Sequence, residues 1–180
     1  MKALEKEHAW REKVRNIMTF KYLSDEELDK MVETGSVLQY ERNEPIVREG
    51  ELDHHFFGVL SGTVSVSVSE AGGKDVFICA LGEGEVFGEA GFFLKIHRTA
   101  SVIARDRAVV FRLERTELAS FIRTFPSAGN KILLITIYGL LKKLRAANQE
   151  LAYERKADLE QADIDDLVGD LLNEMEGAVR

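Results

Sequence analysis

Residues 37–113 constrain the fold of this chain most, because short apolar stretches alternate there with glycine-containing or charged turns. The clearest stretch, residues 63–69, alternates three valines with small polar residues, which is the period-2 pattern of a strand with one buried face. Residues 71–74, Ala-Gly-Gly-Lys, predict a hairpin turn. Further strands are predicted over residues 76–81, 102–104 and 108–113. Many short strands at regular spacing are typical of an antiparallel barrel or jelly roll.

Helical patterns flank this segment on both sides. Apolar residues near helical spacing predict a helix over residues 2–20, and Ser24 with Glu27 forms a capping box for a short helix that Gly35 ends. A second short helix is predicted over residues 115–124, and after Pro126 a long helix is expected from Ser127 or Asn130 to about residue 160.

The predicted fold class is therefore α+β, mainly β. We expect an antiparallel jelly-roll β-barrel flanked by N-terminal helices and a long C-terminal helix. The predicted organisation is an N-terminal helical segment (1–35), the barrel (36–125) and C-terminal helices (126–180) that act as a lid or a dimerisation element.

Two apolar stripes follow the barrel. Leucine or isoleucine recurs every seven residues at 137, 144 and 151, with Leu140 and Ala147 between, which indicates a coiled coil of about two heptads. A second stripe of Ile164, Leu167, Leu171 and Met175 lies on an acidic segment that contains Gly169. These stripes predict a homodimer or a partner protein bound through the C-terminal helices.

Charge and composition exclude several classes of protein. The net charge is −7, and residues 150–180 contain ten Asp/Glu against three Lys/Arg, so direct DNA binding is not expected. No apolar run reaches the roughly 18 residues that a membrane span needs, and the charged N-terminus does not resemble a secretory signal. A single cysteine, Cys79, fits a cytoplasmic protein. His54-His55 lacks further ligands nearby, so neither a metal nor a cofactor is expected.

The residues that indicate a chemistry lie between two predicted strands, in residues 87–102. Glycines there let backbone N–H groups approach an anion, and a helical turn from Glu89 would point its first amides at a phosphate. Arg98 supplies paired donors for phosphate oxygens, and the Glu89 carboxylate suits sugar hydroxyls. By residue type alone, a surface ion pair or two solvated charges would be the favoured explanation of Arg98 and Glu89.

This segment, FGE followed nine residues later by R-T-A-S-V, resembles the phosphate-binding cassette of cyclic-nucleotide-binding domains of the CAP and protein kinase A regulatory type. The resemblance extends over roughly residues 15–150: residues 23–28 resemble the family's first helix, and 46–50, 58–62 and 81–89 resemble its strand and turn motifs. It departs at Ala90, at Asn43 and at the cassette tip, residues 95–97.

The resemblance implies a ligand site for cAMP or cGMP. Glu89 would accept the ribose hydroxyl, and Arg98 would bind the phosphate. Backbone amides near Gly88, Ala90, Gly91 and Ala100, the Thr99 hydroxyl, the apolar side chains of Val66 and Ile78, and Asn148 on the long helix would complete it. For Thr99 the alternative is a plain strand residue, and for Asn148 a solvated one.

The predicted function is that of a cyclic-nucleotide sensor, with cAMP favoured over cGMP, in which binding moves the flanking helices. Two alternatives remain: a ligand-free domain used for protein interaction, and a transcription regulator whose DNA-reading element lies elsewhere. An enzyme is not expected, because the sequence shows no nucleophile–base pair.

Overall fold

The computed structural model describes residues 1–4, 8–70, 73–94 and 96–177, and from residue 154 onward it describes the helical backbone alone. The chain divides into two compact units, Met1–Ile135 and Thr136–Arg180. The first unit contains both β-sheets and the shorter helices, and the second is the continuation of one long helix. No helix in the described ranges is long and apolar enough to cross a membrane.

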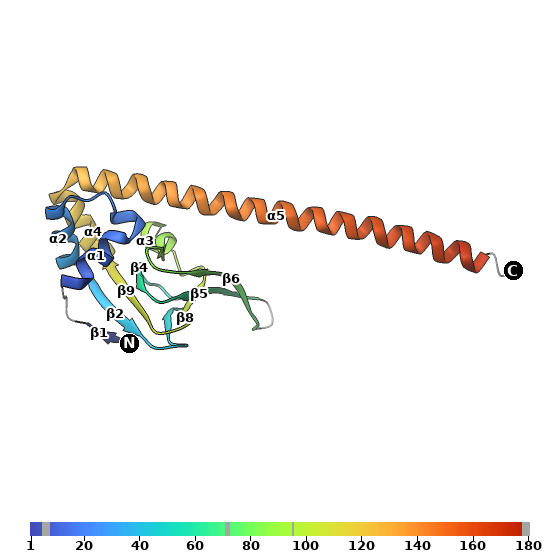
Figure 1. Ribbon diagram of the computed structural model, residues 1–180, viewed down its shortest axis with the longest axis horizontal. Coiled ribbons are helices and arrows are strands. Elements are labelled where there is room, and N and C mark those ends of the chain that lie inside the picture. Colours follow the sequence, from blue (N-terminus) through green and yellow to red (C-terminus); the bar gives the residue numbers. More distant parts are fainter. Residues whose placement is uncertain (5–7, 71–72, 95, 178–180) are drawn as a thin grey trace. The chain divides into compact units, whose positions relative to one another are not determined.

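Two antiparallel sheets form the centre of the first unit (Figure 1). The first sheet has the strand order β1-β2-β9-β4-β7 and the second β3-β8-β5-β6, so neighbouring strands come from distant parts of the sequence. The strands are β1 (Lys2–Ala3), β2 (Ser36–Tyr40), β3 (Pro45–Val47), β4 (His55–Ser61), β5 (Val64–Ser69), β6 (Asp75–Leu81), β7 (Val86–Phe87), β8 (Ser101–Ala104) and β9 (Ala108–Glu114).

The first sheet is apolar on both faces. In β4, Phe56 points into one cluster of buried residues and Phe57 into the other. Likewise in β9, Val109 packs in the helical cluster and Val110 between the sheets. Because successive side chains of a strand point to opposite faces, this sheet lies between the helices and the second sheet. Its sandwiched position explains the nearly unbroken apolar sequence of β9.

Short helices cover the outer face of the first sheet (Figure 1). Ser24 caps α2 as predicted: its side chain accepts from the Glu27 N–H at 3.2 Å, and the Glu27 carboxylate accepts from the Ser24 N–H at 2.7 Å. Gly35 is the C-cap. The helices of this layer are α1 (His8–Asn16), the 3₁₀ turn η1 (Met18–Phe20), α2 (Asp25–Thr34) and α4 (Arg115–Thr124).

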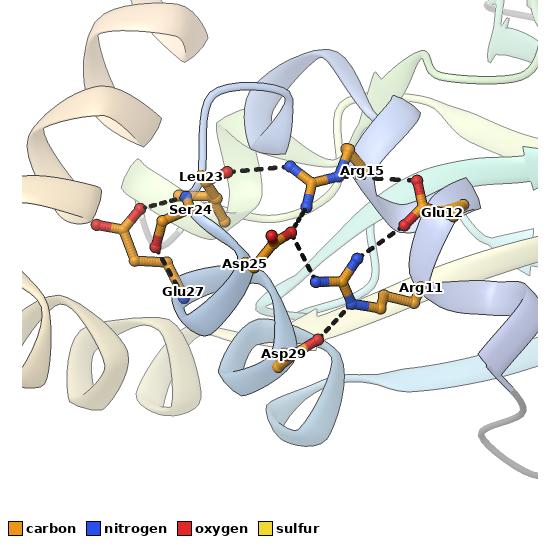
Figure 2. A network of polar contacts seen from close by, with 8 residues as sticks. All are labelled: Arg11, Glu12, Arg15, Leu23, Ser24, Asp25, Glu27 and Asp29. Atoms are coloured by element: carbon orange, nitrogen blue, oxygen red, sulfur yellow. Dashed lines mark hydrogen bonds and ion pairs between the residues drawn. The ribbon is translucent and has the colours of Figure 1, made fainter.

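An ion-pair network joins α1 to α2 (Figure 2). Arg11 donates to Asp25 at 2.8 Å and to Asp29, while Arg15 donates to Asp25 and, at 3.1 Å, to the Leu23 carbonyl. Arg15 lies in the last turn of α1 and Arg11 lies one turn earlier, and both reach the first turns of α2. These pairs link the two helices but add little to the stability of the fold, because their carboxylates are exposed and exposed ion pairs contribute little.

The long helix α5 (Pro126–Gly177) begins inside the first unit. Ala128 and Ile132, four residues apart on one face, are buried in the helical cluster. Lys131 forms an ion pair with Glu27 of α2 at 3.0 Å. These contacts attach the first turns of α5 to the core of the first unit.

The structure corrects two sequence predictions of helix. The helix predicted over residues 2–20 begins at His8, because Lys2–Ala3 instead pairs with β2 as an edge strand. The long helix begins at Pro126 and continues through Gly169 to Gly177, so the two apolar stripes lie on one helix. Proline is tolerated in a first helical turn, where its missing N–H has no partner to lose.

The antiparallel, mainly β fold class with flanking helices and a long C-terminal helix is confirmed. The strands predicted over 63–69, 76–81, 102–104 and 108–113 correspond to β5, β6, β8 and β9. The predicted hairpin turn lies partly at residues 71–72, outside the described residues.

Replacing Gly35 by alanine tests the packing of the first sheet against the helices. A Cβ at Gly35 would lie 2.1 Å from the Phe111 ring, which is fully buried. We expect Gly35→Ala to lower the free energy of unfolding by about 1–3 kcal/mol, the cost of overpacking a core, as measured by urea denaturation. Gly82→Ala is the control, because the nearest atom would be a flexible carboxylate oxygen at 4.0 Å. Equal stability of the two variants would contradict this packing.

Candidate functional site

Arg98 is buried in the first unit, with 4% of its surface exposed. Its Nη2 donates to Asp53 Oδ2 and to the His55 carbonyl, each at 2.7 Å, and its Nη1 donates to the Gly88 carbonyl at 2.9 Å. The guanidinium carbon lies 5.7 Å from the ring centre of Phe57. An ion pair, two carbonyls and an aromatic face thus offset the large cost of burying this charge.

The main chain around Arg98 is held by the same segment that holds its side chain. The Arg98 N–H donates to the Glu51 carbonyl at 2.9 Å, and its carbonyl accepts from the Gly50 N–H at 2.8 Å. Residues 50–55 therefore contact Arg98 at both ends. This double attachment fixes the direction in which the guanidinium points.

Two glycines make room for the guanidinium. Gly88 has φ of +84°, a conformation that glycine adopts without steric cost, and a Cβ there would lie 2.7 Å from Arg98 Nη1. At Gly91, a Cβ would lie 3.1 Å from the same atom. Gly88 is thus required by its conformation and by the close approach of Arg98, and a side chain at Gly91 would crowd the same guanidinium.

One nitrogen of Arg98, the buried Nε, has no hydrogen-bond partner among the described residues. Three of the five N–H groups of a guanidinium are used by the bonds above, and the buried Nε lacks a hydrogen-bond partner. Leaving a buried donor unsatisfied costs about 1–3 kcal/mol. An anion with oxygen acceptors would satisfy it, and arginine suits phosphate oxygens.

Asp53 is the partner of Arg98 that the sequence analysis missed. Burial alone would raise the pKa of Asp53, but hydrogen bonds from His55 and Arg98 and the charges of both side chains outweigh burial and hold that pKa well below its usual range. Asp53 therefore stays ionised at neutral pH. It lies 45 residues from Arg98 in the sequence. Its one local feature is a turn, in which the Asp53 side chain accepts a hydrogen bond from the His55 N–H, two residues later, at 3.1 Å.

Of the predicted cassette residues, the structure brings Gly88 and Gly91 next to Arg98. Glu89 begins the short helix α3 (Glu89–Leu94) and is 8% exposed, and the neighbouring Ala90 is exposed. In α3 the Phe92 N–H donates to the Gly88 carbonyl at 3.1 Å. The N–H groups that precede Phe92 in this helix are therefore not used by hydrogen bonds within it. Thr99 is exposed and Ala100 half-buried, directly before β8.

The residues predicted to line the apolar wall lie on β5 and β6. Val66 is half-buried and packs on the cluster between the sheets, to which Phe57 beneath Arg98 also belongs. Its neighbour across the ladder is Cys79, because Ile78 is the extra residue of a β-bulge and is 53% exposed. Cys79 also packs against this cluster, so the bulge gives it the inward position expected for Ile78.

Asn148 lies on α5 in the second unit and is exposed. Its role as a contact to the base stays a prediction. Within the described ranges, no three His, Cys, Asp or Glu side chains form a group that could hold a metal ion. A groove of about 740 Å³ lies elsewhere in the first unit, lined by residues that include Trp10, Gln39 and Arg107 but not Arg98 or Glu89.

Comparison with known proteins identifies the class. Residues 37–125 match the model of the cyclic nucleotide-binding domain family. The cyclic AMP receptor protein of Thermus thermophilus is 29% identical over 132 residues, which cover 73% of this chain and 59% of the receptor. Human cGMP-dependent protein kinase 2 is 31% identical over 108 residues, which cover 59% of this chain but 14% of the kinase.

The crystal structure of the Thermus thermophilus catabolite activator protein has the same fold, with a TM-score of 0.65 and 28% identity over 74% of this chain and 61% of that one. Residues 37–125 therefore belong to the cyclic nucleotide-binding domain family, a family of regulatory binding domains. The chain spans less than two thirds of these relatives, so the activities of the whole relatives do not transfer directly.

Removal of the Asp53 charge tests the ion pair. Asp53→Asn should lower the free energy of unfolding at pH 7 by about 1–3 kcal/mol. Because folding depresses the pKa of Asp53, its contribution is complete above the unfolded pKa of about 3.9 and is lost as the pH falls towards the folded pKa. The difference between wild type and Asp53→Asn in urea denaturation should therefore narrow between pH 5 and pH 2. A constant difference over this range would contradict the pairing.

Proposed function

We propose that this chain is a sensor that binds a cyclic nucleotide, with the phosphate at Arg98. The buried, unpartnered Nε of Arg98 carries the proposal, because it is a fixed donor without an acceptor among the described residues. Glu89, buried nine residues earlier, supplies the carboxylate for the ribose hydroxyl. The role is regulatory rather than catalytic, in keeping with the family.

The site is organised before the ligand arrives. Asp53, His55 and Gly88 already hold the guanidinium in place, so binding does not have to order a mobile side chain. Preorganisation of this kind reduces the entropic cost of binding. A phosphate would form a charge-assisted hydrogen bond with Nε, which is worth more than a neutral one.

The proposed ligand is cAMP. Relatives named for cAMP and for cGMP both match this chain, and the exposed Thr99 hydroxyl is compatible with either. Binding would favour one arrangement of α5 over others, provided that the ligand interacts differently with the two states. Asn148 is the candidate contact from α5.

The test is calorimetric titration of the nucleotide-stripped protein with cAMP and cGMP. Wild type should show saturable binding, and Arg98→Ala should weaken it at least 100-fold, about 2.7 kcal/mol, because the phosphate loses its charged partner. Arg48→Ala is the matched control, since Arg48 is exposed and lies 3.9 Å from Glu51 without contacting Arg98.

Because Arg98→Ala leaves Asp53 without its buried partner, Glu89→Gln serves as a second variant. It should bind more weakly while Arg98 stays paired. Unchanged affinity in both variants would show that the ligand binds elsewhere. Absence of binding by the wild type would favour a ligand-free interaction domain.

We also propose that α5 pairs with α5 of a second copy. Large apolar side chains at a seven-residue spacing are exposed there, with Ile137, Leu144 and Leu151 more than half exposed. In sequence, residues 136–156 have five Lys/Arg against two Asp/Glu, whereas residues 157–177 have eight Asp/Glu and no Lys/Arg. This charge distribution favours an antiparallel pair, in which unlike halves meet and like halves do not.

Leu144→Asp should convert this dimer to a monomer in analytical ultracentrifugation, because it places a charge in the apolar seam. Gln149→Asp adds the same charge on the opposite face of the helix and should leave the dimer intact. Spin labels at residue 144 of both copies should lie roughly 40 Å apart in an antiparallel pair centred near residue 157, given a rise of about 1.5 Å per residue. A monomeric wild type, or labels in close contact, would contradict this arrangement.

A further inference from the structure

His55 contacts both members of the buried ion pair. Its Nδ1 and its backbone N–H both meet Asp53 Oδ1, the latter at 3.1 Å, while Arg98 binds the other carboxylate oxygen. The His55 carbonyl also accepts from Arg98 Nη2 at 2.7 Å. The ring lies 6.1 Å from the ring of Phe57, over which Arg98 also lies. A change in the charge of this imidazole therefore acts directly on the side chains of the proposed phosphate site.

Protonation of His55 changes the charge of this cluster. With a neutral imidazole, the charges of Asp53 and Arg98 sum to zero, so the site offers an anion a donor but no net charge. With an imidazolium, the cluster carries one net positive charge next to the unpartnered Nε. Histidine side chains ordinarily change charge between pH 5 and 8, and the His55 side chain is 30% exposed, so protons reach it from solvent.

Other charged groups face His55 from neighbouring elements. Glu114 lies opposite it on β9 and favours the imidazolium, whereas Arg112, opposite Phe57, and Arg98 oppose it. Glu89 begins α3, and α3 packs on β4. His54, the residue before His55, has a buried Nδ1 without a hydrogen-bond partner among the described residues. Tyr40 of β2 is close enough to Asp53 to interact with its charge. Among these groups, Asp53 contacts the His55 ring directly.

We propose that His55 is a positioning residue whose protonation is coupled to phosphate binding at Arg98, so that affinity for an anionic nucleotide rises as the pH falls through the histidine range. This inference rests on the proposed function. Asp53 remains ionised throughout this range, because hydrogen bonds and charges from His55 and Arg98 hold its pKa well below its usual value. Linkage is reciprocal: if the proton favours the ligand, the ligand must favour the proton.

The sign of the effect follows from the charge. Affinity should fall as the pH rises, because the positive charge of the imidazolium next to the phosphate is then lost. We expect the dissociation constant of cAMP to be about fivefold or more lower at pH 5.5 than at pH 8.0, the lower end of the range for coupled sites. Binding at intermediate pH should take up a fraction of one proton.

The experiment is calorimetric titration of the full chain with cAMP at both pH values, in paired buffers of different ionisation enthalpy. His55→Asn keeps an N–H donor for Asp53 but cannot gain a charge, so its affinity should no longer depend on pH. His8→Asn is the control, because His8 begins α1 and lies outside both the cassette and the 50–55 segment, and it should keep the wild-type dependence.

A proton NMR titration of the His55 ring, with and without cAMP, gives a readout that needs no variant. A higher pKa in the complex supports the coupling. Binding by the wild type with no pH dependence and no proton uptake, or a pH dependence that persists in His55→Asn, overturns the role of His55 while leaving the site at Arg98 standing. No binding at either pH overturns the proposed function itself.

Discussion

The guanidinium of Arg98 joins segments of the first unit that are distant in sequence. It binds Asp53 and His55 ahead of and within β4, the carbonyl of Gly88 at the turn into α3, and the face of Phe57. A buried arginine is tolerated only if paired and hydrogen-bonded, so these contacts must form together. The geometry of the turn before α3 and of the 50–55 segment thus depends on one side chain, which also holds the donor proposed to bind phosphate.

The two-faced first sheet provides the support for this arrangement. Phe57 stacks on Phe87 with ring centres 4.9 Å apart, and this pair lies on the face toward the second sheet. On the opposite face, Phe56 contacts both Phe20 and Phe92, which connects the sheet to the helical layer and to α3. Strand β4, which carries His55 and Phe57, is therefore packed on both sides, and its position is not free to change alone.

Much of this structure could be predicted from local sequence. The capping box at Ser24, the valine alternation of β5 and the apolar run of β9 each carry their signal in adjacent residues. Edge pairing of Lys2–Ala3 could not be predicted, because two residues show no periodicity and pair only with a strand brought near by the fold. The bulge at Ile78, which gives Cys79 the inward position, is likewise a property of the pairing.

Within the site, Arg98 and Glu89 stood out because they share a motif, whereas Asp53 and His55 are joined to Arg98 only by the fold. The central claim is that the free Nε–H of Arg98 receives the phosphate. The most direct measurement is the ¹⁵N-resolved NMR signal of this Nε–H during addition of cAMP. The account predicts a downfield proton shift and slower exchange with water at saturation. A signal that does not change while the nucleotide binds would contradict it.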